Sequence, residues 1–194
     1  MYRNDFKELA NRLKLDGIDL TIERLQIEVP DAENLLRLLL AERIGGDVVW
    51  LSEYSKVAEW MTNNNGRGLL LMGNVGRGKT EIGRNIMPYI IYHFAKIRGL
   101  ILNCYDAVEL GARCKEFIDN DRPLCIDDLG TEKDAKSRDV FERLADQMEK
   151  RGRFLIVTTN LSAEDIRRIY GDRVFDRLKG NTTCIVFKGD SMRG

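Results

Sequence analysis

The chain has 194 residues, of which 43% are hydrophobic, and its 31 Lys and Arg side chains balance its 31 Asp and Glu side chains. These values suit one globular domain with a buried core, and they exclude a disordered chain, a fibrous chain and a strongly basic protein that coats DNA. Its apolar runs all fall short of the roughly 18 residues that span a bilayer, and its charged N-terminus is unlike a signal peptide. We therefore expect a soluble, cytoplasmic protein outside the membrane.

The first third of the chain has helical patterns. These patterns cover residues 5–13, 30–46 and 53–61. Pro30 at the start of the second pattern and glycines at its end mark the limits of a helix, and Ser52 is the expected N-cap of the third. An apolar stripe on the second helix is expected from Leu35, Leu38, Leu39 and Ile44. We assign residues 1–50 to a short helical N-terminal segment, which either packs on the main domain or docks a partner, and residues 51–194 to the main domain.

From residue 68 onward, short apolar runs alternate with helical patterns. The apolar runs are residues 68–74, 100–104, 123–128, 154–160 and 182–188. The helical patterns are residues 79–97, 106–118, 138–152, 161–171 and 172–180. Asp106 and Ser137 are the expected N-caps of the second and third of these helices. Continuous apolar runs separated by helices indicate a five-stranded parallel sheet buried on both faces, so we predict a three-layer α/β domain.

A glycine-rich loop joins the first predicted strand to the following helix. Its sequence, Gly73-Asn74-Val75-Gly76-Arg77-Gly78-Lys79-Thr80, fits the phosphate-binding pattern G-x-x-x-x-G-K-[ST]. Glycines let the backbone wrap closely around phosphate oxygens, and the next helix directs its N-terminus at the same anion. Lys79 supplies charge to the β- and γ-phosphates, and Thr80 offers a hydroxyl to Mg²⁺. We predict a P-loop NTPase in which these residues and Glu81 bind nucleotide.

Two carboxylates end the third apolar run. Because the carboxyl ends of parallel strands meet at one edge of a sheet, Asp127 is placed to hold Mg²⁺ beside the phosphate loop. Asp128 stands where a carboxylate that activates water is expected. The metal ligands predicted from the sequence are therefore Thr80 and Asp127.

Four ordered motifs resemble the AAA+ ATPases of the DnaC/DnaI type, which load the replicative helicase in bacteria and phages. The motifs are the phosphate loop, the acidic strand with residues 127–132, residues 158–161 and residues 170–178. The resemblance covers about residues 50–193 and implies an AAA+ core without a C-terminal lid domain. It also implies ATP and Mg²⁺ as cofactors, assembly into a homo-oligomer on ATP binding, and a replicative helicase and single-stranded DNA as partners.

The resemblance also implies roles for individual polar residues. Asn160 matches the sensor residue that orients the attacking water, and Arg177 matches the arginine finger that reaches the ATP of a neighbouring subunit, with Arg173 as the fallback. Arg193 matches a second sensor arginine near the chain end. Preorganised cations of this kind stabilise the charge of the phosphoryl transition state.

The chain departs from the family pattern in two ways that bear on the site. An Asp-Asp pair stands where many AAA+ enzymes have Asp-Glu, so we expect slow turnover, and Glu132 is an alternative source of the second carboxylate. Arg77 replaces a small residue; it either contacts phosphate or points outward, and we expect the second.

DNA contacts are only weakly indicated. In the family, single-stranded DNA touches the helix after the second strand, and the candidate contacts here are Tyr105, Arg113, Lys115, Lys133 and Lys136. The alternative is that these side chains form an ordinary solvated face.

Three functions remain open at this stage. The first is an ATPase that loads a replicative helicase onto single-stranded DNA. The second is an IstB-like transposition helper, from the same family, that binds duplex DNA. The third is a nucleotide-gated adaptor with negligible turnover.

Overall fold

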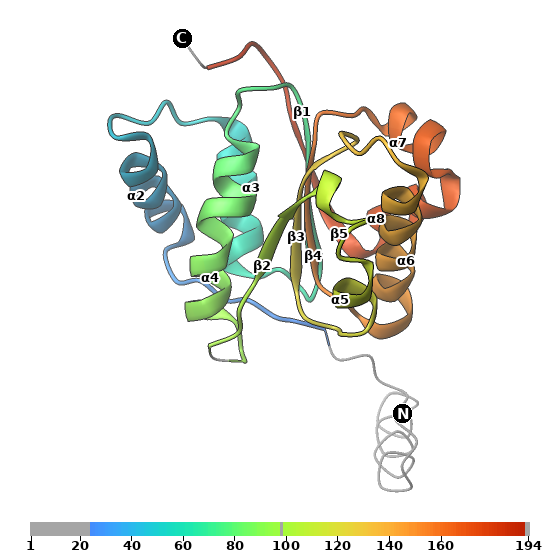
Figure 1. Cartoon of the computed structure of the whole chain (residues 1–194). Helices are drawn as coiled ribbons and strands as arrows, with labels where there is room; N and C mark the ends of the chain where they lie inside the picture. Colours follow the sequence, from blue (N-terminus) through green and yellow to red (C-terminus); the bar gives the residue numbers. More distant parts are fainter. Residues whose placement is uncertain (1–23, 98, 193–194) are drawn as a thin grey trace, which may run out of the picture.

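A computed structural model describes residues 24–97 and 99–192 (Figure 1). The predicted helix at residues 5–13 and Arg193 therefore lie outside the described residues. Five parallel strands form one sheet in the order β2-β3-β4-β1-β5. The strands are β1 (Gly68–Gly73), β2 (Asn103–Asp106), β3 (Leu124–Leu129), β4 (Leu155–Thr159) and β5 (Thr182–Phe187).

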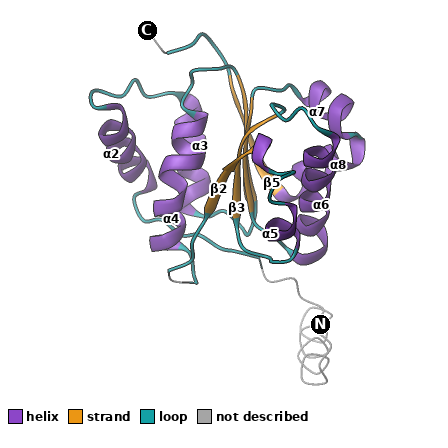
Figure 2. Ribbon diagram, in the orientation of Figure 1, coloured by secondary structure: helices purple, strands orange, loops and turns teal. Residues whose placement is uncertain are grey.

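Helices cover both faces of this sheet, which confirms the predicted three-layer α/β fold (Figures 1 and 2). One layer contains α2 (Ala32–Ile44), α3 (Ser52–Thr62), the π-helix η1 (Glu81–Ile86) and α4 (Met87–Phe94). The other contains the 3-10 helix η2 (Ala107–Glu109), α5 (Cys114–Ile118), α6 (Ala135–Arg151), α7 (Ala163–Tyr170) and α8 (Asp172–Asn181). Among the described residues, no helix combines the length and the apolar character needed to cross a membrane.

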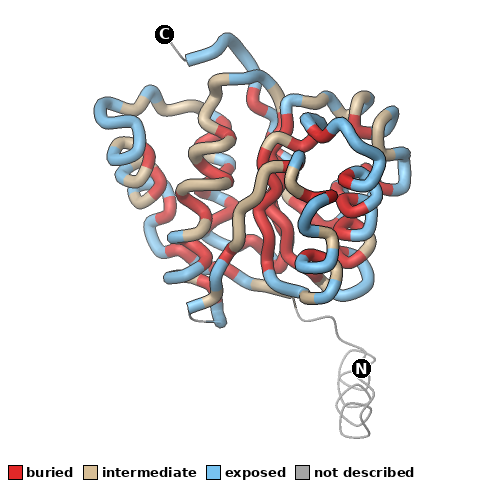
Figure 3. The backbone as a smooth tube through the Cα atoms, in the orientation of Figure 1, coloured by how far each residue is buried: buried red, intermediate tan, exposed pale blue. Residues whose placement is uncertain are grey.

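The central strand β1 shows why its sequence is a continuous apolar run. Leu69 and Leu71 pack into the core on the α2–α4 side, whereas Leu70 and Met72 pack into the core on the α5–α8 side. Successive side chains of a strand point to opposite faces, so a strand with helices on both sides needs apolar residues at every position. The buried tube at the centre of Figure 3 is this sheet.

Two predicted elements differ from the structure around β2. The strand begins at Asn103 rather than at residue 100, and Ile101 is 64% exposed although it belongs to the apolar run. The helix predicted at 106–118 is divided into η2 and α5. Asp106 is an N-cap as predicted, but of η2, where it forms a capping box with Glu109. A turn containing Gly111 follows, and a Cβ atom at Gly111 would lie 2.7 Å from Ser137 Oγ of α6.

The ends of three further helices also differ from prediction. Ser137 is not the N-cap of α6, because Asp134 holds that position and accepts a hydrogen bond from the Ser137 N–H at 2.8 Å. Ser52 is the first residue of α3, and Leu51 is its N-cap. The helix after the phosphate loop ends at Phe94 and contains a π-helical turn.

The packed face of helix α2 overlaps only in part with the predicted stripe, because Leu35 and Leu39 are half-buried against the core as expected. Its buried residues are Ala32, Leu36 and Leu40, whereas Leu38 is 68% exposed and Ile44 is 52% exposed. The buried residues of α2 therefore occur at every fourth position from Ala32, and they form the face that contacts α3 and η1. This corrects the expected stripe through Leu38 and Ile44.

Candidate nucleotide-binding site

The phosphate loop lies at the carboxyl end of β1, at the top of Figure 1. Gly73, Gly76 and Gly78 have φ angles of 109°, 76° and 84°, which L-residues with a side chain rarely adopt. At Gly73 a Cβ atom would lie 2.1 Å from the Phe187 carbonyl oxygen on β5, so this position requires glycine. The loop borders a cavity of about 330 Å³. Its lining consists of Ile44, Tyr54, Val75, Gly76, Gly78, Lys79, Thr80, Glu81, Asp128, Asn160 and Met192.

A larger cavity of about 740 Å³ lies near the amino ends of β3 and β4. Its described lining includes Arg122, Pro123 and Phe154. We place the functional site in the smaller cavity because the carboxyl edge of a parallel sheet collects the polar ends of several strands.

Lys79 folds back onto the loop that precedes it. Its Nζ donates to the carbonyl oxygens of Gly73 at 2.8 Å and Asn74 at 2.6 Å, and to Asn160 Oδ1 at 2.9 Å. Asn160 directly follows β4, which lies next to β1. The structure thus brings together the phosphate-loop lysine and the predicted sensor residue, although they are 81 positions apart in the sequence.

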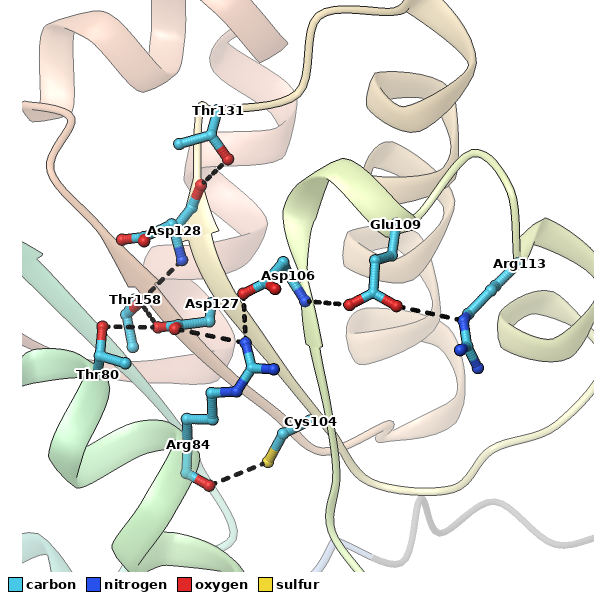
Figure 4. Close-up of polar contacts among 10 residues, drawn as sticks. All are labelled: Thr80, Arg84, Cys104, Asp106, Glu109, Arg113, Asp127, Asp128, Thr131 and Thr158. Carbon is cyan, nitrogen blue, oxygen red and sulfur yellow. Dashed lines mark hydrogen bonds and ion pairs between the residues drawn. The ribbon is translucent and has the colours of Figure 1, made fainter.

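The two predicted metal ligands are in direct contact. Thr80 Oγ1 donates to Asp127 Oδ1 at 3.1 Å, and Thr158 Oγ1 donates to the same oxygen (Figure 4). A hydroxyl and a carboxylate are the hard oxygen ligands that Mg²⁺ prefers, and phosphate oxygens and water commonly complete its octahedron. These residues therefore fit a Mg²⁺ ion that is shared with a bound phosphate.

Asp128 is turned toward the cavity by an irregularity of the sheet. The pairing of β3 with β4 shifts register between Ile126 and Leu129, and Asp128 has a φ of 53°. Asp tolerates this left-handed conformation better than most residues, and bulges of this kind often re-aim a side chain next to an active site. Its backbone N–H donates to Thr158 Oγ1 at 3.0 Å. The local backbone thus places Asp128 in the cavity lining.

Glu132, the alternative carboxylate, points into the fold. It is 5% exposed, and its two oxygens accept hydrogen bonds from the Gly130 N–H at 2.9 Å and from the Tyr170 hydroxyl. Of the two carboxylates left open by the sequence, Asp128 is the one that lines the cavity.

Arg84 also reaches the acidic strand, although no sequence motif marks it as a site residue. Its guanidinium contacts Asp106 and lies 3.8 Å from Asp127 Oδ2 (Figure 4). Burial alone would lower the pKa of Arg84, but Asp106 and, more weakly, Asp127 raise it above its ordinary value. The sequence does contain one indication of this role: Arg84 follows Thr80 by four residues on the predicted helix, and residues four apart lie on the same helix face.

Arg77 does not point outward, so that expectation is wrong. Its guanidinium lies 3.7 Å from Glu53 Oε1 on α3 and donates to the Asp190 carbonyl oxygen at 3.3 Å. Burial raises the pKa of Glu53, but hydrogen bonds from the Lys188 N–H at 2.9 Å, from its own backbone N–H and from the Ser52 hydroxyl, with the charge of Arg77 as the smallest contribution, together bring this pKa below its ordinary value. Arg77 therefore ties the loop to α3 and to the chain after β5.

The chain after β5 crosses the phosphate loop. The Asn74 side-chain amide donates to the Gly189 carbonyl oxygen at 2.7 Å, and the Met192 N–H donates to the Gly76 carbonyl oxygen at 3.0 Å. Tyr54 of α3 approaches from another side, and its hydroxyl donates to the Arg77 carbonyl oxygen at 3.3 Å. Sequence reasoning missed Glu53 and Tyr54, because no motif marks a helix that packs beside a loop.

The two arginines of α8 lie away from the phosphate loop, in a groove between α6 and α8. Arg177, the expected arginine finger, is 6% exposed and pairs with Asp146 and, at 3.0 Å, with Glu149. Arg173 is 72% exposed, and its Nη2 lies 3.9 Å from Asp146 Oδ1. Within this chain, Arg177 therefore fastens α8 to α6.

Two of the candidates for DNA contact, Tyr105 and Arg113, pair with one another and with acidic side chains. The Arg113 guanidinium stacks 5.0 Å from the centre of the Tyr105 ring and lies 3.3 Å from Glu109 Oε2. The Tyr105 hydroxyl donates to Glu116 Oε1 at 2.8 Å. Both side chains thus have intramolecular partners here.

The sheet order, the glycine loop and the acidic strand define a P-loop NTPase fold. A scan against models of protein families finds no match, and a search among curated proteins finds none either. Solved structures do match. The DnaC helicase loader aligns with a TM-score of 0.53 and 21% identity over 83% of this chain and 93% of that chain.

Two other solved structures agree with this match. DnaI aligns with a TM-score of 0.51 and 20% identity over 66% of this chain and 73% of that chain. AMPPCP-bound DnaA from Aquifex aeolicus aligns with a TM-score of 0.53 and 18% identity over 74% of this chain and 49% of that chain. The chain therefore shares the fold of the DnaC and DnaI structures, and the resemblance read from its motifs is confirmed at the level of the fold.

Proposed function

We propose that this chain is a Mg²⁺-dependent ATPase that acts as an accessory factor in DNA replication and loads a replicative helicase onto single-stranded DNA. The observation that carries the ATPase proposal is the convergence of Lys79, Thr80, Asp127, Asp128 and Asn160 at one edge of the sheet. The replication role is supported by the fold shared with the DnaC helicase loader.

Each residue has a definite task in this proposal. Lys79 exchanges its bonds to loop carbonyl oxygens for bonds to phosphate oxygens, and Thr80 and Asp127 hold the metal. The Mg²⁺ ion neutralises charge on the phosphate oxygens when it is bound. Asp128 accepts a proton from the attacking water, and the Asn160 amide orients that water.

We propose that hydrolysis requires assembly. Among the described residues that line the cavity, Lys79 is the one Lys or Arg, whereas phosphoryl transfer usually needs an additional cation. A second copy of the chain can supply it. The exposure of Arg173 supports this residue as the arginine that reaches the neighbouring site, while Arg177 holds α8 in place.

Calorimetry with Mg²⁺ and ATP tests the nucleotide part of the proposal. Lys79→Ala is expected to lose binding, and Lys56→Ala, an exposed lysine of α3, is expected to keep it. Equal binding by both variants would refute the site. Phosphate release with single-stranded DNA and a replicative helicase then tests the loading role. A stimulated rate is expected, whereas stimulation by duplex DNA alone would favour a transposition helper.

A nucleotide-gated adaptor is the second candidate, and one contact favours it. Arg43 at the end of α2 lies 3.1 Å from Glu81, next to Thr80, and Ile44 lines the cavity. Nucleotide binding can therefore act directly on the N-terminal segment. Nucleotide binding without measurable phosphate release in the presence of DNA and helicase would support this candidate over the enzyme.

A further inference from the structure

Two carboxylates stand side by side at the carboxyl edge of the sheet. Asp106 ends β2, and its register partner on β3 is Asp127. Both are adjacent to the guanidinium of Arg84, which extends from η1 into the space between the two strand ends (Figure 4). Asp127 is 2% exposed, so its charge is poorly screened by water.

The arrangement gives Arg84 two competing partners. Its Nη1 makes a close contact with Asp106 Oδ1 and a longer one, 3.8 Å, with Asp127 Oδ2. The other oxygen of Asp127 accepts hydrogen bonds from Thr80 and Thr158. The positive charge of Arg84 beside Asp127 repels a Mg²⁺ ion that binds there. The Asp106 carboxylate neutralises part of the Arg84 charge and so weakens this repulsion.

Asp106 is held in place by its own local structure. It caps η2, and its backbone N–H donates to Glu109 Oε1 at 3.2 Å. Glu109 is in turn 3.3 Å from Arg113. Asp106 thus belongs to a capping box with Glu109, and its position does not depend on Arg84 alone.

We infer that Asp106 and Arg84 are positioning residues that set the Mg²⁺ affinity of the nucleotide site: Arg84 weakens metal binding at Asp127, and Asp106 strengthens it by holding Arg84. This inference rests on the proposed binding of Mg²⁺ and ATP. It assigns a role to an ion pair that lies beside the metal ligands without contributing a ligand. Residues in such positions commonly change metal affinity strongly.

The two single variants must act in opposite directions. Asp106→Asn removes a negative charge but keeps an N-cap residue, so η2 is retained. We expect the Mg²⁺ concentration for half-maximal ATP binding to rise roughly 10-fold. Arg84→Gln removes the competing cation and is expected to lower that concentration. The double variant is expected to return close to the wild-type value, and Arg84→Lys is expected to resemble the wild type.

The measurement is calorimetric or fluorescent titration of ATP at a series of Mg²⁺ concentrations, with thermal unfolding without nucleotide as a check on the fold. Asp121→Asn and Arg151→Gln are matched controls, because this exposed pair, 3.5 Å apart, lies near the amino ends of the strands. They make the same charge changes and are expected to leave the Mg²⁺ requirement unchanged.

Each outcome has one meaning. If the wild-type protein binds no ATP with Mg²⁺, the proposed function fails. If it binds, but the single variants shift the Mg²⁺ requirement in the same direction or leave it unchanged, the positioning role is overturned while the proposed function stands. If Asp106→Asn does not fold, Arg84→Gln still decides, because an unchanged or higher Mg²⁺ requirement contradicts the inference.

Discussion

The Ser137 hydroxyl connects the start of α6 to the turn at Gly111, because it both donates and accepts a hydrogen bond. It donates to Asp134 Oδ2 at 2.8 Å and accepts from the Gly111 N–H at 2.9 Å, and it is fully buried. The sequence suggested that Ser137 was the cap of α6, because a serine before an apolar periodic segment is a usual signal. Asp134 is the N-cap instead, and Ser137 lies in the first turn of α6, where its hydroxyl accepts the hydrogen bond from the Gly111 N–H.

Ser137→Ala is therefore expected to destabilise the protein through a buried, unpaired amide. The Gly111 N–H would lose its acceptor, so the free energy of unfolding should fall by about 1–3 kcal/mol. Urea denaturation measures this loss. Ser52→Ala, at an exposed position that does not cap α3, should change stability by less than about 0.5 kcal/mol. Equal effects of the two substitutions would contradict the proposed pairing.

Three aspartates with lowered pKa values make the free energy of unfolding depend on pH in the acidic range. The pKa values of Asp134 and Asp165 are lowered chiefly by hydrogen bonds from Ser137 and Ser162, and that of Asp146 by Lys150 and then Arg177. A carboxyl whose pKa is depressed in the folded state stabilises the protein above its ordinary pKa, and this contribution is lost as the pH falls through the folded value.

We therefore expect stability to fall between about pH 4 and pH 2. Urea denaturation across this range is the measurement. Asp146→Asn should show a shallower decline than the wild type, since it has one depressed carboxyl fewer. A wild-type profile that stays flat below pH 4 would show that these hydrogen bonds and ion pairs do not favour the ionised carboxylates.

At the scale of elements, α2 shows where a sequence pattern is insufficient. Leucines occupy positions 35, 36, 38, 39 and 40, so they surround the helix and define no single apolar face. The helix could be predicted, but its rotation is set by contact with α3 and η1. That contact buries Leu36 and leaves Leu38 in solvent.

Leu36→Ala and Leu38→Ala form a matched pair that tests this packing. The first removes a fully buried side chain and should lower the free energy of unfolding by about 2–5 kcal/mol. The second removes an exposed side chain and should change it by less than about 0.5 kcal/mol. Chemical denaturation of both variants suffices. If Leu38→Ala proves the more damaging substitution, the rotation of α2 is wrong.

The acidic strand β3 shows a second limit of sequence reasoning. The apolar run and its terminal carboxylates predicted a strand that reaches the phosphate loop, because parallel strands share their carboxyl edge. The register shift beside Asp128 depends on hydrogen bonds to β4, which a sequence does not display. The pattern could therefore place Asp127 and Asp128 at the site, but it could not separate the role of Asp128 from that of Glu132.

At the scale of the whole molecule, the cavity beside the phosphate loop receives side chains from α2, before the sheet, and from the segment after β5. Ile44 of α2 and Met192 after β5 both line it, beside the phosphate loop. The arginines of α8 lie in the opposite helical layer, where Arg177 is paired with α6. The motif predicted that an arginine of this segment reaches the ATP of a neighbouring subunit, with Arg177 as the first choice and Arg173 as the fallback. The two arginines differ in exposure, which depends on the packing of α8: Arg173 is exposed and Arg177 is buried.

If the phosphate loop belongs to one subunit and Arg173 reaches it from the next, two inactive variants should complement each other in a mixed assembly. Arg173→Ala is expected to bind ATP normally but to lose hydrolysis by on the order of 1,000-fold, because each cavity would lack the arginine of its neighbour. Lys79→Ala is expected to lose its own nucleotide but to keep Arg173. In mixed assemblies, the Lys79→Ala subunit completes the cavity of the Arg173→Ala subunit, so phosphate release should exceed that of either variant alone.

The same mixture with Arg177→Ala separates the two arginines. If Arg177 only fastens α8 to α6, Arg177→Ala should lower the thermal unfolding temperature, and its activity at low temperature should exceed that of Arg173→Ala. If Arg177→Ala is instead stable, inactive and complemented by Lys79→Ala, while Arg173→Ala retains activity, then Arg177 leaves its pairs with Asp146 and Glu149 on assembly and is the arginine that reaches the neighbouring site.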